Sequence, residues 1–125
     1  MSKPPRIFDS EIIVNENNRW FFRGNEIIQE NVLEFFKKSL FEDDKGIYIH
    51  NTHGELSEQG YITSFGFPLK IINWIQNEDG KMYFVLDSGE TIEPIEINFY
   101  YDSSEKLFCM RKKDKYIKIN FNRKT

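Results

Sequence analysis

Residues 11–41 read EIIVNENNRWFFRGNEIIQENVLEFFKKSLF and carry the main signals that determine the fold. Two runs of β-branched and aromatic residues flank the polar cluster 15–18, which predicts a β-hairpin over residues 11–23. Gly24 then separates a strand pattern from a helix pattern. Because glycine adopts a positive φ at no steric cost, we expect one at Gly24, where the chain turns from hairpin to helix.

Residues 28–41 form the only helical pattern in the chain. Glu30 lies near the expected N-terminus and Lys38 near the C-terminus, which suits the helix dipole. We place the N-cap at Asn25, with Gln29 as the alternative. The apolar residues recur at the spacing of one helical face, namely at Ile28, Val32, Leu33, Phe36 and Leu40.

The rest of the chain consists of short β-rich segments separated by turns. These segments are residues 47–50, 61–63, 69–76, 81–86, 91–92, 95–101, 107–110 and 116–121. Turn signals that recur about every 8–12 residues are typical of an antiparallel arrangement. We therefore predict a single α+β domain over residues 1–125. It would be mostly an antiparallel β meander, with one amphipathic helix after an N-terminal hairpin and a frayed lead at residues 1–9.

The composition supports a β-rich protein of the cytoplasm. Aromatic residues make up 16% of the 125 residues and alanine is absent, which argues against a helical bundle. Apolar runs stay well below the ~18 residues of a membrane span, and the N-terminal sequence lacks the apolar core of a secretory signal. Cys109 is the only cysteine, so an intrachain disulfide is excluded and a reducing compartment is expected.

Few residues suggest catalysis. His50 and His53, followed by Glu55, have a spacing that suits a metal site in a helix or turn. His50 ends the predicted strand 47–50, however, and the polar stretch 51–54 that contains His53 fits a solvated loop better. Cys109 lies in an apolar run, as a buried structural cysteine does. Because the sequence contains no recognisable catalytic constellation, we expect a non-enzymatic protein without a cofactor.

Charge is distributed unevenly along the chain. Residues 51–105 carry a net charge of −8 and residues 106–125 a net charge of +7, whereas the whole chain carries −3. The basic end predicts a patch that could bind nucleic acid or another anion, unless acidic neighbours in the same sheet neutralise it. The residues of this candidate patch are Arg111, Lys112, Lys113, Lys115 and Lys118.

Three short motifs follow one another between residues 13 and 69. A strand and a turn lead to Trp20 and Gly24, a helix carries Phe36 on its inner face, and the turn 44–48 reads Asp-Lys-Gly-Ile-Tyr. In this order they resemble the small bacterial proteins grouped as domain of unknown function twelve-eighty-five. The chain departs from that pattern at 64–67, where an acidic residue is expected before Pro68. Since that family has no settled function, the resemblance implies neither a reaction nor a cofactor.

Three functions remain open from the sequence. The first is a protein-interaction module whose acidic surface captures a basic protein partner. The second is a binder of nucleic acid or another anion through the basic C-terminal hairpin. The third is a small-molecule cleft between helix and sheet, lined by Trp20, Phe36 or Trp74. We favour the first, rank nucleic acid lower, and expect no contact with membranes.

Overall fold

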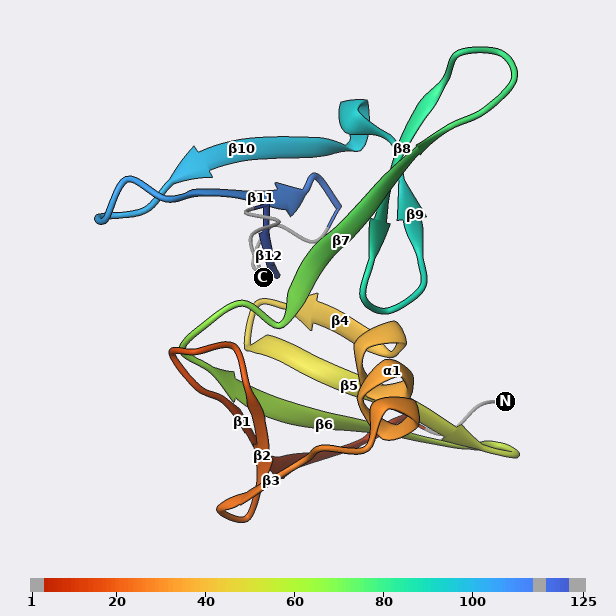
Figure 1. The fold of residues 1–125 in the computed structure, drawn as a ribbon. Coiled ribbons are helices and arrows are strands. Elements are labelled where there is room, and N and C mark those ends of the chain that lie inside the picture. Colours follow the sequence, from red (N-terminus) through yellow and green to blue (C-terminus); the bar gives the residue numbers. More distant parts are fainter. Residues whose placement is uncertain (1–3, 114–116, 122–125) are drawn as a thin grey trace.

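The computed structural model describes residues 4–113 and 117–121, and within them the chain forms two six-stranded sheets, one above the other (Figure 1). The first sheet contains β1 (Arg6–Val14), β2 (Trp20–Phe22), β3 (Asn25–Glu26), β4 (Leu40–Asp43), β5 (Gly46–His53) and β6 (Leu56–Ser64). The second contains β7 (Leu69–Gln76), β8 (Met82–Leu86), β9 (Thr91–Ile92), β10 (Ile97–Tyr101), β11 (Leu107–Arg111) and β12 (Lys118–Asn120). The helix α1 (Glu30–Lys38) connects β3 to β4, and the short 3-10 helix η1 (Pro94–Glu96) precedes β10.

The sheet topology corrects the predicted meander. The strand orders are β3-β2-β1-β6-β5-β4 and β10-β11-β12-β7-β8-β9. Where strands that are consecutive in sequence pair, they are antiparallel, as expected, but β1 pairs parallel with β6, and β12 pairs parallel with β7. Parallel partners need a long connection, so both pairings join segments that are distant in sequence. The mainly β character with one helix is confirmed, whereas the single simple meander is wrong.

The N-terminal segment is part of the first sheet. Residues 6–9 were expected to belong to a frayed lead, but β1 begins at Arg6 and pairs with β6 from Glu58 onwards. The pairing explains the difference, because β6 supplies hydrogen-bond partners that no local pattern reveals. Residues 1–3 of the expected lead lie outside the described residues.

The hairpin and the chain reversal at Gly24 are confirmed. Strands β1 and β2 pair antiparallel through Val14 and Trp20. Gly24 has a φ of +83°, the conformation that lets the chain leave β2 without the clash that a Cβ would cause. The segment after Gly24 forms the short strand β3 before the helix starts, so the predicted N-cap Asn25 is wrong.

The helix is shorter than predicted. It spans Glu30–Lys38 with Gln29 at the N-cap, the alternative considered above. At the C-terminus the Ser39 N–H donates to the Phe36 carbonyl at 3.1 Å. Leu40 then pairs with Ile49 of β5, so the last two residues of the predicted helix belong to β4 instead. Pairing with β5 overrides the helical spacing there.

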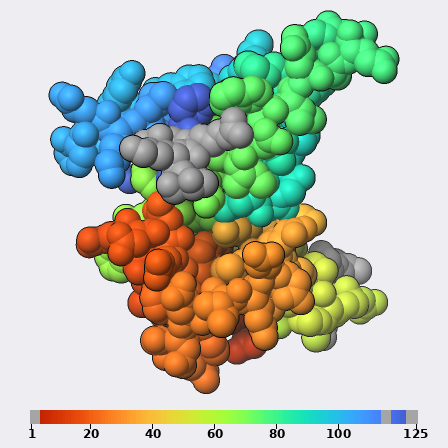
Figure 2. Space-filling view, viewed as in Figure 1, coloured from red at the N-terminus to blue at the C-terminus, as the bar shows by residue number. Residues whose placement is uncertain are grey.

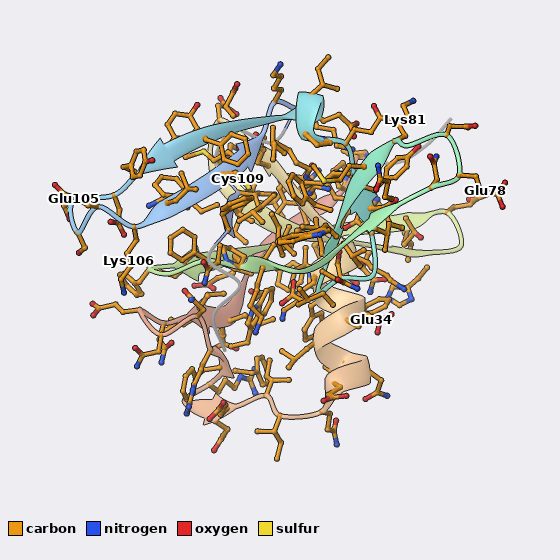
Figure 3. All side chains as sticks on the ribbon, turned by 45° about the horizontal axis from the view of Figure 1, so that its top comes forward. Glu34, Glu78, Lys81, Glu105, Lys106 and Cys109 are labelled. Carbon is orange, nitrogen blue, oxygen red and sulfur yellow. The ribbon has the colours of Figure 1, made fainter. Side chains whose placement is uncertain are left out.

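A common core joins the two sheets. Buried residues of the first sheet such as Val14 and Leu40 belong to one cluster with Leu69, Leu86 and Ile119 of the second. Cys109, labelled inside the molecule in Figure 3, is part of this cluster. The predicted burial of Cys109 is therefore confirmed, and burial raises the pKa of its thiol to about 12.

Two hairpins extend away from this core. The β7–β8 hairpin projects from the body of the molecule in Figure 2. Glu78 and Lys81 lie at its tip, and Glu105 and Lys106 lie at the tip of the β10–β11 hairpin (Figure 3). Consequently, much of β7 beyond Ile71 is solvent-exposed.

Candidate functional site

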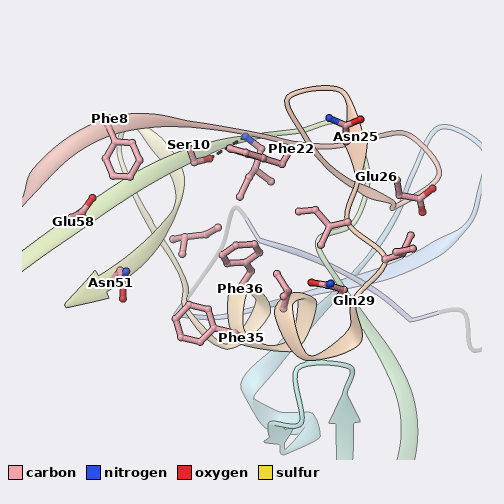
Figure 4. A pocket seen from close by; sticks show the side chains of 15 residues that line it. Phe8, Ser10, Phe22, Asn25, Glu26, Gln29, Phe35, Phe36, Asn51 and Glu58 are labelled. Atoms are coloured by element: carbon pink, nitrogen blue, oxygen red, sulfur yellow. Dashed lines mark hydrogen bonds between the residues drawn. The ribbon is translucent and has the colours of Figure 1, made fainter. Parts of the chain in front are cut away.

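A pocket of about 580 Å³ lies between α1 and the inner face of the first sheet (Figure 4). This sheet curves around the helix (Figure 1), so β1, β2, β3, β5 and β6 all contribute side chains. The apolar wall consists of Phe8, Ile12, Phe22, Ile27, Ile28, Val32, Phe35, Phe36 and Ile49. The polar groups are those of Ser10, Asn25, Glu26, Gln29, Asn51 and Glu58.

Strand alternation and helical spacing build the two walls. Phe8, Ser10 and Ile12 of β1 line the pocket, and Phe8 and Ile12 pair with Gly60 and Ile62, which share one face of β6. On α1, Val32, Phe35 and Phe36 are three or four residues apart and share one face. The sheet and the helix therefore direct these side chains into the same space.

The helix is too short to fill this space. It contains nine residues, none of which is buried. Phe35 is 51% exposed even though it lines the pocket. The floor of the pocket is shaped by Gly60 of β6, because a Cβ at this position would lie 3.0 Å from Cζ of Phe8. A side chain at residue 60 would therefore force the Phe8 ring to shift from its place across β6.

A β-bulge bends β1 beside the pocket. The register with β6 shifts between Asp9 and Ile12, and Glu11 has a φ of +63°, which is strained for a residue other than glycine. The Ser10 hydroxyl supplies hydrogen bonds where the backbone pairing of β1 with β6 is interrupted. It donates to the Tyr61 carbonyl at 2.7 Å and accepts from the Ile12 N–H at 3.2 Å. The bulge is thus held in place by specific hydrogen bonds rather than left loose.

One end of the pocket carries charged groups. Figure 4 shows Phe8, Asn51 and Glu58 close to one another at this end. Arg6 Nη1 lies 3.3 Å from Glu58 Oε2, and the Arg6 guanidinium carbon lies 4.7 Å from the centroid of the Phe8 ring. His53 Nε2 accepts from Asn51 Nδ2 at 3.0 Å and lies 3.8 Å from Glu58 Oε1.

The three predicted cleft residues are in different places. Phe36 lines the pocket, and Trp20 lies behind it, only 2% exposed, with its ring stacked on Phe36 at 6.3 Å between centroids. The structure does not bring Trp74 to this cleft, because it belongs to β7 of the second sheet and is 52% exposed. Sequence reasoning missed Phe8 and Glu58, since only the pairing of β1 with β6 brings them together.

The described residues of the predicted basic patch differ in exposure, although Arg111, Lys112 and Lys113 line one pocket together with Glu90. Arg111 is buried, and its Nη1 lies 3.4 Å from Glu90 Oε2. Lys112 and Lys113 are exposed in the turn after β11. Lys118 is exposed on β12, with Nζ 5.6 Å from the centroid of the Phe108 ring. Lys115 lies outside the described residues.

Both histidines lie in β5, which was predicted for His50 but not for His53. Because they are three residues apart in a strand, their side chains point to opposite faces. The His50 ring packs edge-on against Phe41, whereas His53 lies near Glu58. Among residues 4–113 and 117–121, no three or more His, Cys, Asp or Glu side chains are grouped so that they could hold a metal ion.

The outer face of the first sheet contains a hydrogen-bonded pair. The Tyr61 hydroxyl donates to the Asp43 carboxylate. This bond raises the pKa of Tyr61 to about 12 and lowers the pKa of Asp43. Tyr61 also packs against Tyr48, so the pair belongs to an aromatic cluster on the side of the sheet away from the pocket.

No α-helix in the described part of the chain has the length and apolarity needed to cross a membrane.

The sequence matches no protein-family model and no curated protein. Two solved structures are nevertheless similar to this chain. A DUF1285 family protein from Silicibacter pomeroyi matches with a TM-score of 0.71 at 14% identity, over 96% of this chain and 68% of that one. A DUF1285 family protein from Shewanella baltica matches with a TM-score of 0.64 at 11% identity, over 90% of this chain and 84% of that one. The resemblance is therefore confirmed at the level of the fold, because this chain has the fold of these DUF1285 family proteins.

Proposed function

We propose that this chain binds a small, largely apolar molecule in the pocket between α1 and the first sheet. The observation that carries the proposal is a pocket of about 580 Å³ with mainly apolar walls and a few polar groups. Small-molecule sites usually have volumes of about 300–1,000 Å³ and this kind of lining. Of the three functions left open by the sequence, this one has the most specific geometric support.

The exposed apolar area supplies the driving force. Phe22 and Phe35 line the pocket and are each about half exposed. Covering roughly 100 Å² of either ring contributes about 2.5 kcal/mol at 25 cal/mol per Å². Two such rings supply roughly 5 kcal/mol before the cost of immobilising the ligand is subtracted. A micromolar affinity corresponds to about 8 kcal/mol, so the other wall residues must contribute as well.

The test is a titration with a neutral apolar dye, N-phenyl-1-naphthylamine, followed by its fluorescence. We expect saturable binding that 1-decanol reverses by competition. Val32→Trp places a large ring on the pocket face of α1 and should abolish binding, whereas Ile75→Trp on the exposed part of β7 should leave it unchanged. Circular dichroism checks that both variants fold. Equal dye binding by the wild type and the folded Val32→Trp variant would contradict the proposal.

A second proposed function is the capture of a basic protein by the β7–β8 hairpin. The hairpin projects from the body and exposes Trp74, Ile75 and Met82, while Glu78 and Asp79 lie in its turn. Aromatic and methionine side chains are enriched in interfaces, and the net charge of −8 over residues 51–105 would steer a basic partner.

The test of this second proposal compares the proteins bound from a lysate by the wild type with those bound by a double variant that carries Trp74→Ser and Met82→Ser. Support requires a basic protein whose binding weakens with salt and is lost in the variant, whereas retention by the variant excludes this surface.

A further inference from the structure

The lining of the pocket is unevenly charged, which bears on the class of ligand that it accepts. Among the described residues that line it, the ionisable side chains are Glu26 and Glu58, both carboxylates, and no lysine, arginine or histidine is among them. A carboxylate beside an apolar wall attracts a cation and repels an anion more strongly than it would in water, because the local dielectric constant is lower. The pocket is therefore suited to neutral or positively charged molecules.

Glu58 is the better placed of the two carboxylates. Its side chain is 25% exposed, and it belongs to β6. In the sheet register Glu58 is opposite Asn51 on one side and Arg6 on the other, so these side chains share one face. Phe8 is two residues further along β1 on this same face. A carboxylate, an amide oxygen and an aromatic ring thus converge at one end of the pocket (Figure 4).

These three groups are the ones that bind an ammonium. A carboxylate pairs with its charge, an amide oxygen accepts its N–H, and the face of an aromatic ring attracts cations. The Asn51 amide nitrogen already donates to His53, which leaves its oxygen as an acceptor for a ligand.

Arg6 shows that this end of the pocket already attracts a cation. Its guanidinium lies 3.3 Å from Glu58 and 4.7 Å from the centre of the Phe8 ring, the two contacts that a ligand ammonium would make. The Arg6 side chain is 70% exposed, and exposed ion pairs contribute little to stability. Arg6 is therefore positioned as a replaceable occupant of a cation site.

From these contacts we propose that the pocket selects amphiphiles with a cationic amine head, which is held by Phe8, Asn51 and Glu58 in place of Arg6. The apolar body of the molecule then lies along Phe35, Phe36 and the neighbouring aliphatic side chains. This inference rests on the proposed function, since it names the ligand class of the same pocket.

The experiment compares three ligands of equal chain length, n-decylamine, 1-decanol and decanoate, as competitors of the neutral dye at pH 7.5. We expect the amine to bind at least tenfold more tightly than the alcohol, and decanoate to bind most weakly. Glu58→Gln should reduce the affinity for the amine about tenfold and leave that for the alcohol within twofold. Glu55→Gln, in the exposed turn between β5 and β6, is the matched control and should change neither affinity. Arg6→Ala should increase the affinity for the amine.

The outcomes separate the two proposals. If decanoate binds more tightly than decylamine, or if Glu58→Gln leaves the preference for the amine unchanged, the cation site is refuted while the pocket proposal stands. If the dye does not bind saturably, the pocket proposal fails and the cation-site proposal fails with it. A tenfold preference for the amine that is lost only in Glu58→Gln supports both.

Discussion

The two sheets have the same number of strands in the described residues but pack their inner faces differently. The second sheet contributes Leu69, Leu86 and Ile119, which are completely buried. The inner face of the first sheet is covered in part by α1, a helix without a single buried residue, and an open pocket remains beside it. A pocket of about 580 Å³ with mainly apolar walls therefore interrupts the packing beside α1, at the place where the proposed ligand would bind.

The second sheet also positions the helix that covers the pocket. Lys37 Nζ of α1 lies 2.6 Å from Asp87 Oδ2 in the turn between β8 and β9, and both side chains are largely buried. Asp87 Oδ1 accepts the Lys70 N–H at 3.0 Å, which fixes the carboxylate to β7. The well-packed part of the molecule thus serves as the support on which the wall of the pocket is held.

The largest expected effect concerns the two tryptophans, one in each sheet. Trp20 is buried against Phe36, so Trp20→Ala should lower the free energy of unfolding by about 3–5 kcal/mol. Trp74 is half exposed, and Trp74→Ala should cost less than about 1 kcal/mol. Urea denaturation of both variants measures the difference. Equal losses would show that the projecting β7–β8 hairpin contributes to the core.

The ion pair between the two parts should have the next largest effect. Asp87→Asn removes the charge that pairs with Lys37, and breaking a buried pair costs about 3–5 kcal/mol, which partial exposure reduces to roughly 2 kcal/mol. The control is Glu34→Gln, which removes the half-exposed Glu34–Lys38 pair of the same helix and should cost less than about 0.5 kcal/mol. Thermal unfolding measures both. Similar effects of the two variants would mean that the second sheet does not hold α1.

A smaller effect is expected at the floor of the pocket. Gly60→Ala brings a methyl group to 3.0 Å from the Phe8 ring, so the ring must move and we expect a loss of about 1 kcal/mol together with weaker dye binding. Combining Gly60→Ala with Phe8→Leu relieves the contact with the ring, although the 3.1 Å contact with Cβ of Ser10 remains, so the loss of stability should be smaller than the sum of the two single variants. If Gly60→Ala alone changes neither stability nor dye binding, Phe8 does not form this floor.

The smallest expected effect lies on the outer face of the first sheet. Tyr61→Phe removes the hydrogen bond that lowers the pKa of Asp43, so this pKa should rise towards its ordinary value. Because the folded pKa of Asp43 is depressed, its contribution to stability is present above the ordinary carboxylate pKa and is lost as the pH falls through the folded value. For Tyr61 the raised pKa means a contribution that is lost between about pH 10 and 12. NMR titration of the Asp43 carboxyl carbon in both proteins checks the prediction, and an unchanged pKa would contradict it.

The sequence predicted what local patterns determine. The hairpin that ends at Phe22, the positive φ of Gly24, the burial of Cys109 and the strand 69–76 all follow from patterns that span only a few residues. Turn residues and strand periodicity act over the same short distances, which is why these features were accessible.

The pocket was only partly predictable, because its shape depends on strand pairing between distant segments. A strand period of two residues indicates which side chains share a face but not which strand lies alongside. Phe8 meets Gly60 and Glu58 meets Arg6 only through the parallel pairing of β1 with β6. The same reason explains the misplaced Trp74, since the helical and strand patterns did not reveal that the chain crosses into a second sheet after Ser64.

The central claim is that the space beside α1 binds a ligand while the second sheet remains a packed support. The most direct test is a titration of the ¹⁵N-labelled protein with 1-decanol, followed by the amide signals in ¹H–¹⁵N correlation spectra. We predict saturable shifts at Phe8, Val32 and Ile49 in the wall of the pocket, with the amides of residues 73–83 unaffected. Shifts that cluster on residues 73–83, or an absence of saturable shifts in the pocket wall, would contradict this account.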